Sequence, residues 1–330
     1  MKLLKRILLA LLLVVIIGGT VSFFYFKNKF LSAPPNELTV SNLGQSFDFS
    51  WGSSTVGDKI EPHAFMFVPV RIPGVDHKMV MQFDVGATNT VLLYKNIVSI
   101  NEKYGNIFKI DTVDGKYRVQ DLALKIGNVD VKASSLGIGA IGNPINWADT
   151  TQVIKIGTVG NDFIEKNPIT IDFKNQKIKL TSALDPDVKN EEDYQPFSFD
   201  GRKIFLKAKL NKKPVELWYD SGSSAFEFIV EEKVFNAMAK PGAKRETYTG
   251  YSWGKPVPIH NIESEGMFEF GKTQVPLNYV SYFEWPNKIQ AFILKAANIG
   301  RDLGGMTGNK LFLDKTLILD APNLRYKVIE

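Results

Sequence analysis

The amino-acid sequence predicts a mostly β protein whose two similar lobes follow an N-terminal apolar helix. Apolar and polar residues alternate in many short runs that are bounded by Gly, Pro and Asn, which is the pattern of strands. The same series of motifs occurs twice with matching spacing, which indicates an internal duplication. Helical periodicity is sparse, and residues 231–240 form the best helix candidate.

The first element is an apolar segment within residues 1–29. Three basic residues precede an uncharged run over residues 7–26, and Lys27 and Lys29 follow it. Twenty residues at helical rise just span the hydrocarbon core of a bilayer. The run lacks a clear small-residue cleavage site, so we expect a retained membrane anchor, with a cleaved signal peptide as the alternative. The basic residues before the run predict that the main domain lies outside the cytoplasm, in a periplasmic or extracellular location.

Charge and composition exclude several classes of function. The net charge of +5 comes from the first thirty residues, because the rest of the chain has 35 basic and 35 acidic residues. A neutral domain is a poor partner for nucleic acid. The chain has no cysteine, which excludes disulfides, thiol nucleophiles and thiolate metal sites. Because His63, His77 and His260 have no metal-ligand spacing and accompany no nucleophile motif, we expect no metal site and no Ser-His-Asp triad.

The remaining elements follow in order along the chain. Residues 30–60 are expected to be a linker and first strand region, and residues 61–181 an N-terminal β lobe. An acidic stretch over residues 182–198 is typical of an interlobe linker. Residues 199–330 are expected to form the C-terminal β lobe.

Each lobe contains an Asp-x-Gly turn after an alternating strand. Residues 83–88 read FDVGAT and residues 219–224 read YDSGSS, so that Asp84 and Asp220 stand 136 positions apart. The match continues without gaps through the preceding strand. An isolated Asp-x-Gly is usually only a turn, since both residues favour turns. Two copies in matching surroundings instead predict a pair of carboxylates on a duplicated scaffold.

The two lobes also end alike. Residues 157–161 read GTVGN and residues 305–309 read GMTGN, with an offset of 148 positions. Each motif leads through a strand to a second Asp, which is Asp172 in the first lobe and Asp320 in the second. A turn ending in Asn follows each of these two Asp residues, so we expect their side chains to cap turns and to take no part in chemistry.

With these motifs the chain resembles the pepsin-like and retropepsin-like aspartic proteases over residues 61–330. The resemblance implies a two-lobed acid protease fold in which Asp84 and Asp220 meet as a catalytic dyad. It further implies a polypeptide substrate, a monomeric enzyme and an aspartic endopeptidase activity that needs no cofactor. The residues expected to shape or support the two turns are Gly86, Thr88, Ser221, Gly222, Ser223 and Ser224.

The chemistry of such a pair follows from electrostatics. Two carboxyls that are brought close cannot both ionise easily, so their pKa values separate. The ionised member can take a proton from a water molecule that attacks the peptide carbonyl. The protonated member can donate to the developing oxyanion.

Two features depart from the family pattern and keep other interpretations open. Val85 occupies a position where the family has a hydroxyl residue, so only Ser221 can cross-link the two turns. The hairpin expected over residues 108–120, with its turn at Asp114 and Gly115, has Tyr117 on its return strand and no tyrosine on its approach strand. The alternative functions are therefore a non-catalytic module that binds a peptide or protein, and a purely structural envelope protein.

Two other patterns have ordinary explanations. Residues 137–142 match G-x-G-x-x-G, but Asn143 and Pro144 follow at once and no βαβ unit surrounds the motif, so we expect a flexible loop. Three tryptophans, Trp218, Trp253 and Trp285, could line a cleft, although core or rim positions are commoner for this residue.

Overall fold

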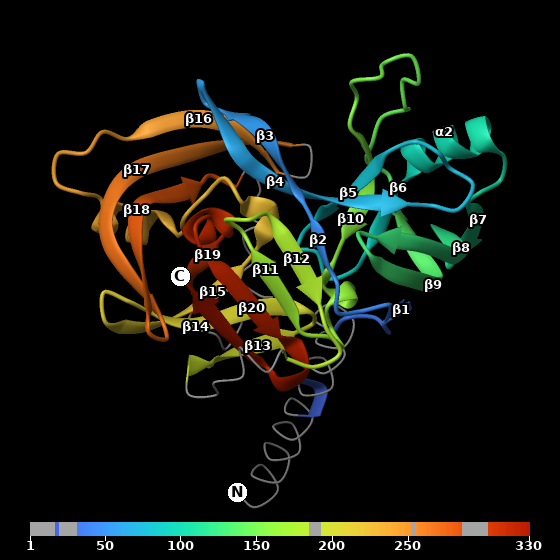
Figure 1. Cartoon of the computed structure of the whole chain (residues 1–330). Helices are drawn as coiled ribbons and strands as arrows, with labels where there is room; N and C mark the ends of the chain where they lie inside the picture. The colour runs from blue at the N-terminus through green and yellow to red at the C-terminus, as the bar shows by residue number, and fades with distance from the viewer. Residues whose placement is uncertain (1–16, 20–31, 185–192, 253–254, 286–302) are drawn as a thin grey trace, which may run out of the picture.

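The computed structural model describes residues 17–19, 32–184, 193–252, 255–285 and 303–330, and shows a β-rich molecule with few helices (Figure 1). Most of the predicted anchor over residues 7–26 lies outside the described residues, as do Trp253 and part of the predicted linker over residues 182–198. None of the helices in the described ranges has both the length and the apolar character that crossing a membrane requires.

The N-terminal lobe is built on a nine-stranded sheet within the described residues. The strands run in the order β1-β9-β6-β10-β5-β4-β8-β7, and β3 pairs with β4. They are β1 (Leu38–Ser41), β3 (Ser50–Val56), β4 (Lys59–Arg71), β5 (Met79–Phe83), β6 (Val91–Leu93), β7 (Lys109–Val113), β8 (Lys116–Ile126), β9 (Val129–Gly139) and β10 (Ile154–Val159). Helix α2 (Tyr94–Tyr104) follows β6 and buries Ile97 and Ile100.

The C-terminal lobe contributes most of a twelve-stranded sheet in the described part of the chain. The strands run in the order β16-β17-β14-β13-β21-β20-β11-β12-β2, while β15 pairs with β14 and β19, and β18 pairs with β17. They are β2 (Ser46–Asp48), β11 (Ile169–Asp172), β12 (Lys177–Leu180), β13 (Gln195–Asp200), β14 (Lys203–Leu210), β15 (Lys213–Tyr219), β16 (Glu246–Ser252), β17 (Lys255–Phe270), β18 (Thr273–Phe283), β19 (Leu303–Thr307), β20 (Thr316–Asp320) and β21 (Arg325–Ile329). Helix α3 (Glu232–Met238) packs against β17 and β18.

The two lobes join where one strand of the repeat pairs with its equivalent strand from the other lobe. Strands β11 and β20 occupy equivalent positions in the duplication and pair antiparallel, with Thr170 opposite Ile318. These two residues are themselves equivalent at the offset of 148 positions, so a local two-fold axis passes between them. Strands β12 and β21 flank the pair and extend the sheet on each side, in the centre of Figure 1.

A continuous apolar core underlies both lobes. Phe173, from the N-terminal half of the chain, stacks on Phe312 with ring centroids 6.3 Å apart. Phe312 also makes edge contacts with Tyr219 and Phe270 of the C-terminal lobe. All four side chains are buried, so the lobes share one packed interior behind the two Asp-x-Gly turns.

Several elements differ from the sequence expectations. The region over residues 30–60 contains β1, β2 and β3, and the predicted linker over residues 182–198 already includes the start of β13. Helix α2 was not expected, because its β-branched isoleucines resemble a strand in a local window. The candidate helix over residues 231–240 corresponds to α3.

Candidate active site

The backbone holds the two Asp-x-Gly turns in equivalent positions. Strand β5 runs parallel to β10 and leads into Asp84, and β15 runs parallel to β19 and leads into Asp220. The Asp84 N–H donates to the Val159 carbonyl at 3.0 Å, and the Asp220 N–H donates to the Thr307 carbonyl at 2.9 Å. Each Asp is thus fixed by the last residue of the neighbouring parallel strand.

The glycines bring the two carboxyls face to face. The Gly86 N–H donates to Asp84 Oδ1 at 2.9 Å, and the Gly222 N–H donates to Asp220 Oδ1 at 2.8 Å. A Cβ atom on Gly86 would lie 2.1 Å from Asp220 Oδ1, and one on Gly222 would lie 2.7 Å from Asp84 Oδ2. Each glycine therefore contacts the carboxyl of the opposite turn, at a separation that no other residue type permits.

The environment separates the protonation of the two carboxyls. Burial raises the pKa of Asp84, while N–H donors from Gly86, Gly222 and Ala87 and a hydrogen bond with Asp220 oppose that rise. Burial and the charge of Asp84 raise the pKa of Asp220 to about 8. Near neutral pH the Asp220 carboxyl therefore favours its protonated form, because burial and the charge of Asp84 both oppose its ionisation. Both side chains are only half-buried, so solvent reaches them.

Ser221 connects the two turns beneath the carboxyls. Its hydroxyl accepts a hydrogen bond from the Val85 N–H at 2.8 Å and donates to the Phe83 carbonyl at 3.2 Å. Val85 is buried at the equivalent position and has no hydroxyl with which to make the reciprocal bonds. The cross-link is therefore made from the C-terminal lobe alone.

The other predicted hydroxyls take different partners. Ser223 Oγ donates to Asp220 Oδ2 at 3.3 Å, and its equivalent in the other turn, Ala87, has no hydroxyl. Ser224 Oγ donates to the Ser221 carbonyl at 2.7 Å and so supports the turn indirectly. Thr88 Oγ1 accepts from the side chain of Asn89 at 3.0 Å.

Two buried asparagines hold the turns from behind, and sequence reasoning did not assign them to the site. Asn161 Nδ2 donates to the Val85 carbonyl at 2.6 Å and to the Arg202 carbonyl of the other lobe at 2.7 Å. Asn309 Nδ2 donates to Ser224 Oγ at 2.6 Å, and Asn309 Oδ1 accepts from the Tyr219 hydroxyl at 2.6 Å. The signal was present, since both residues end the repeated Gly-x-x-Gly-Asn motif.

An ion-pair network supports the Asp84 turn. Arg202, from the turn between β13 and β14, is buried and donates to Asn89 Oδ1 at 2.5 Å. It also pairs with Glu165 at 3.0 Å. Beside it, the carboxyl of Asp162 accepts from the backbone and the hydroxyl of Thr90 at 2.8 and 2.7 Å. Burial raises the pKa of Asp162, and its hydrogen bonds with Thr90 and the charge of Arg202 oppose that rise.

The second pair of repeated carboxylates caps turns. Asp172 accepts from the backbone and side chain of Asn175 at 2.9 and 2.8 Å. Asp320 accepts from Asn323 Nδ2 at 2.9 and 3.0 Å and pairs with Arg325.

The predicted hairpin is formed by β7 and β8. Its turn residues Asp114 and Gly115 both have positive φ, of 50° and 71°, which suits a two-residue hairpin turn. Tyr117 on the return strand is exposed and stacks on Tyr94 at the start of α2, with ring centroids 5.3 Å apart.

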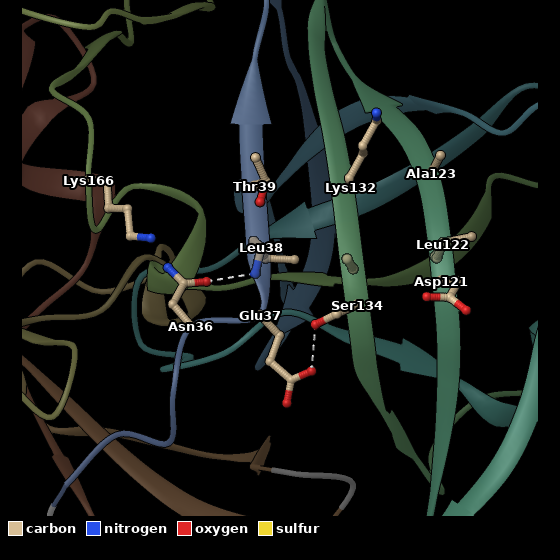
Figure 2. A pocket seen from close by; sticks show the side chains of 11 residues that line it. Asn36, Glu37, Leu38, Thr39, Asp121, Leu122, Ala123, Lys132, Ser134 and Lys166 are labelled. Atoms are coloured by element: carbon tan, nitrogen blue, oxygen red, sulfur yellow. Dashed lines mark hydrogen bonds between the residues drawn. The ribbon is translucent and has the colours of Figure 1, made fainter.

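A separate polar groove of about 480 Å³ lies at the β1, β8 and β9 edge of the N-terminal lobe (Figure 2). Its lining includes Glu37, Asp121, Lys132 and Lys166. Neither Asp84 nor Asp220 belongs to this groove. Among the described residues, no group of three or more His, Asp or Glu side chains could hold a metal ion. Residues 137–139 of the G-x-G-x-x-G match form the end of β9, and no helix opens after them.

To the geometry of the site, comparison with known proteins adds a structural likeness. No protein-family model matches the chain, and no curated protein sequence matches it. Among solved structures, the chain is similar to an aspartic proteinase from Irpex lacteus, with a TM-score of 0.48 and 11% sequence identity. That likeness covers 88% of this chain and 97% of the other. The functional interpretation below therefore rests on the geometry of the site itself.

Proposed function

We propose that the protein is an aspartic endopeptidase that hydrolyses peptide bonds through Asp84 and Asp220. The observation that carries the proposal is the contact of each turn glycine with the opposite carboxyl, which places two half-buried carboxyls against each other. The charge of Asp84 adds to the effect of burial and raises the pKa of Asp220 to about 8. This is the arrangement that acid and base catalysis by a carboxyl pair requires.

Asp84 is the base in the proposed reaction. It removes a proton from a water molecule between the carboxyls as the water oxygen attacks the carbonyl carbon of the scissile bond. Asp220 donates its proton to the carbonyl oxygen, which becomes a hydroxyl of the tetrahedral intermediate. The intermediate collapses when Asp84 passes its proton to the amine nitrogen and Asp220 takes a proton from one of the two hydroxyls, as the C–N bond breaks. The protons balance within the pair, so no cofactor takes part.

The proposed substrate is an extended polypeptide bound between the two lobes. The uncharged run over residues 7–26 supports a membrane anchor, and the basic residues before it support a domain outside the cytoplasm. Full-length protein should then fractionate with membranes, whereas recovery of a mature form that starts after Phe26 would show cleavage instead.

The decisive test replaces each carboxyl in turn. Asp84→Asn and Asp220→Asn should each abolish hydrolysis of an unfolded protein substrate between pH 3 and 7, while circular dichroism shows an intact fold. Asp172→Asn is the matched control, because that carboxyl caps a turn of the same repeat, and it should retain activity. Hydrolysis that survives in either dyad variant would refute the assignment.

A second candidate function is peptide or protein binding without hydrolysis. It is favoured by Val85 and Ala87, which leave the Asp84 turn without the two hydroxyls that Ser221 and Ser223 supply to the other turn. An intact protein that binds extended peptides with the carboxyls present, yet cleaves none across the same pH range, would establish this alternative.

A further inference from the structure

A polar pair lies on the sheet face that leads into the Asp84 turn. Gln82 precedes Asp84 by two residues on the same chain segment, so the two side chains share one face. Lys155 on the adjacent parallel strand β10 donates from Nζ to Gln82 Oε1 at 3.4 Å. Strands β5 and β10 run side by side in Figure 1.

The charge of Lys155 acts on the dyad. The lysine is half-buried, and burial lowers its pKa while the charge of Asp84 raises it. Within the described residues no carboxylate lies within the 4.0 Å of an ion pair with Lys155. Its positive charge therefore partly offsets the negative charge of Asp84 from a distance. Its ammonium group can still donate hydrogen bonds beyond the one to Gln82.

The amide NH2 group of Gln82 adds a second hydrogen-bond donor beside the Lys155 ammonium group. Because Lys155 can only donate, it fixes the Gln82 oxygen toward itself and directs the amide NH2 away. An ammonium group and an amide NH2 side by side match a carboxylate, which accepts several hydrogen bonds. An isolated acidic group here would otherwise be repelled by ionised Asp84.

The surroundings are apolar and partly open. Phe67 and Thr158 pair directly with Gln82 on the neighbouring strands and so share its face. Phe65 stacks on Phe67 with ring centroids 6.1 Å apart, and both rings are half-buried. A charge interaction is stronger beside such a surface than in open water.

The equivalent face of the other lobe has a different character. Trp218 occupies the position that corresponds to Gln82, two residues before Asp220. Its ring is half-buried, and Lys203 lies 6.0 Å from the ring centroid. The two sides of the dyad therefore present a cationic polar pair and a large aromatic ring.

We propose that Lys155 and Gln82 form a specificity site that favours substrates with an acidic side chain next to the scissile bond, on the Asp84 side. This inference rests on the proposed peptidase function and names its substrate class. Lys155 binds the substrate carboxylate, Gln82 orients it, and Trp218 contacts an apolar residue on the opposite side of the bond.

The test uses full-length protein in detergent micelles at pH 6. Two peptides that differ only in Glu or Gln next to a central Phe are compared by kcat/KM, and a mixed peptide library reports cleavage preference. Lys155→Met and Lys155→Glu are the test variants. Lys132→Met is the control, because that lysine lies in the separate groove of Figure 2.

The wild type and the Lys132→Met control should prefer the Glu peptide about tenfold, a ratio that a single charge-assisted contact can supply. Lys155→Met should abolish that preference mainly through KM, and Lys155→Glu should reverse it in favour of Lys or Arg. Unchanged preference in both Lys155 variants, with cleavage retained, would overturn the proposal.

A binding measurement separates this proposal from the peptidase assignment. The same two peptides, with the bond before Phe reduced to an amine so that it cannot be hydrolysed, are titrated by fluorescence anisotropy. Tighter binding of the Glu form that is lost in Lys155→Met supports the specificity site even if the wild type cleaves nothing. Equal binding of both forms to the wild type contradicts it, whatever the protein hydrolyses.

Discussion

The Asp84 and Asp220 turns share one backbone geometry but differ in the side chains around them. Both Asp residues are anchored to a parallel strand and both carboxyls accept from the glycine two residues on. The Asp220 turn then adds Ser221 and Ser223, whereas the Asp84 turn has Val85 and Ala87 and is supported instead through Asn89 and Arg202. The duplicated backbone brings the carboxyls together, and different side chains support each turn.

The difference also has a functional side. Burial raises the pKa of both carboxyls. Backbone N–H donors from both turns oppose that rise at Asp84, whereas the charge of Asp84 adds to it at Asp220. A symmetrical pair would share its proton equally. In the proposed reaction this asymmetry makes Asp84 the base and Asp220 the acid.

The largest expected effect on stability comes from replacing the carboxyl of Asp220 with an amide that cannot ionise. Because its folded pKa is about 8 and its ordinary value is 3.8, the folded state holds this proton more tightly than the unfolded state. The associated stability is fully present below pH 4 and is lost as the pH rises toward 8. Asp220→Asn should therefore be more stable than the wild type by on the order of 5 kcal/mol at pH 8 and equal to it near pH 4. Urea unfolding across this range measures the difference, and a pH-independent difference would contradict the raised pKa.

The two asparagines should differ when each is replaced by alanine. Asn309→Ala removes the acceptor of the buried Tyr219 hydroxyl and a donor to Ser224, which should cost about 2–3 kcal/mol. Asn161→Ala leaves only two backbone carbonyls without this donor and should cost about 1–2 kcal/mol. Thermal unfolding of the two variants measures which one loses more stability. A larger loss for Asn161→Ala would contradict the expectation that the buried Tyr219 hydroxyl depends on Asn309.

Alanine at the turn glycines should separate the carboxyls. Because the added Cβ of Gly86→Ala would lie 2.1 Å from Asp220 Oδ1, one carboxyl must move, at a cost of about 2 kcal/mol. Gly222→Ala should cost less, since its closest approach is 2.7 Å. Carbon-13 NMR titration of the Asp carboxyls should show the pKa of Asp220 falling in Gly86→Ala. A pKa that stays unchanged would show that the carboxyls do not depend on this contact.

The smallest effects concern the cross-link between the turns. Ser221→Ala removes the acceptor of the buried Val85 N–H and should cost about 1–2 kcal/mol. Val85→Thr adds a hydroxyl at nearly constant volume and should be neutral or stabilising by up to about 1 kcal/mol, with no loss of activity. A loss of about 2 kcal/mol in denaturant unfolding of Val85→Thr would place position 85 in a purely apolar pocket.

The sequence alone predicted the mostly β architecture, the duplication and the two residues at the centre of the site. These features are local, because alternation, turn residues and motif spacing are all written within windows of about twenty positions. The hairpin turn at Asp114 and Gly115 and helix α3 could be predicted for the same reason. Helix α2 could not, since only the burial of its own Ile97 and Ile100 in the folded lobe favours a helix there.

Only the tertiary structure decided the environment of each carboxyl and what supports each turn. Ser221 reaches Val85 across 136 positions, Arg202 reaches Asn89 across 113, and Lys155 reaches Gln82 across 73. No local pattern encodes such contacts, because they exist only after the two lobes have packed around one core. Burial and charge at the dyad likewise depend on that packing, and they turn two similar Asp-x-Gly turns into two chemically different groups.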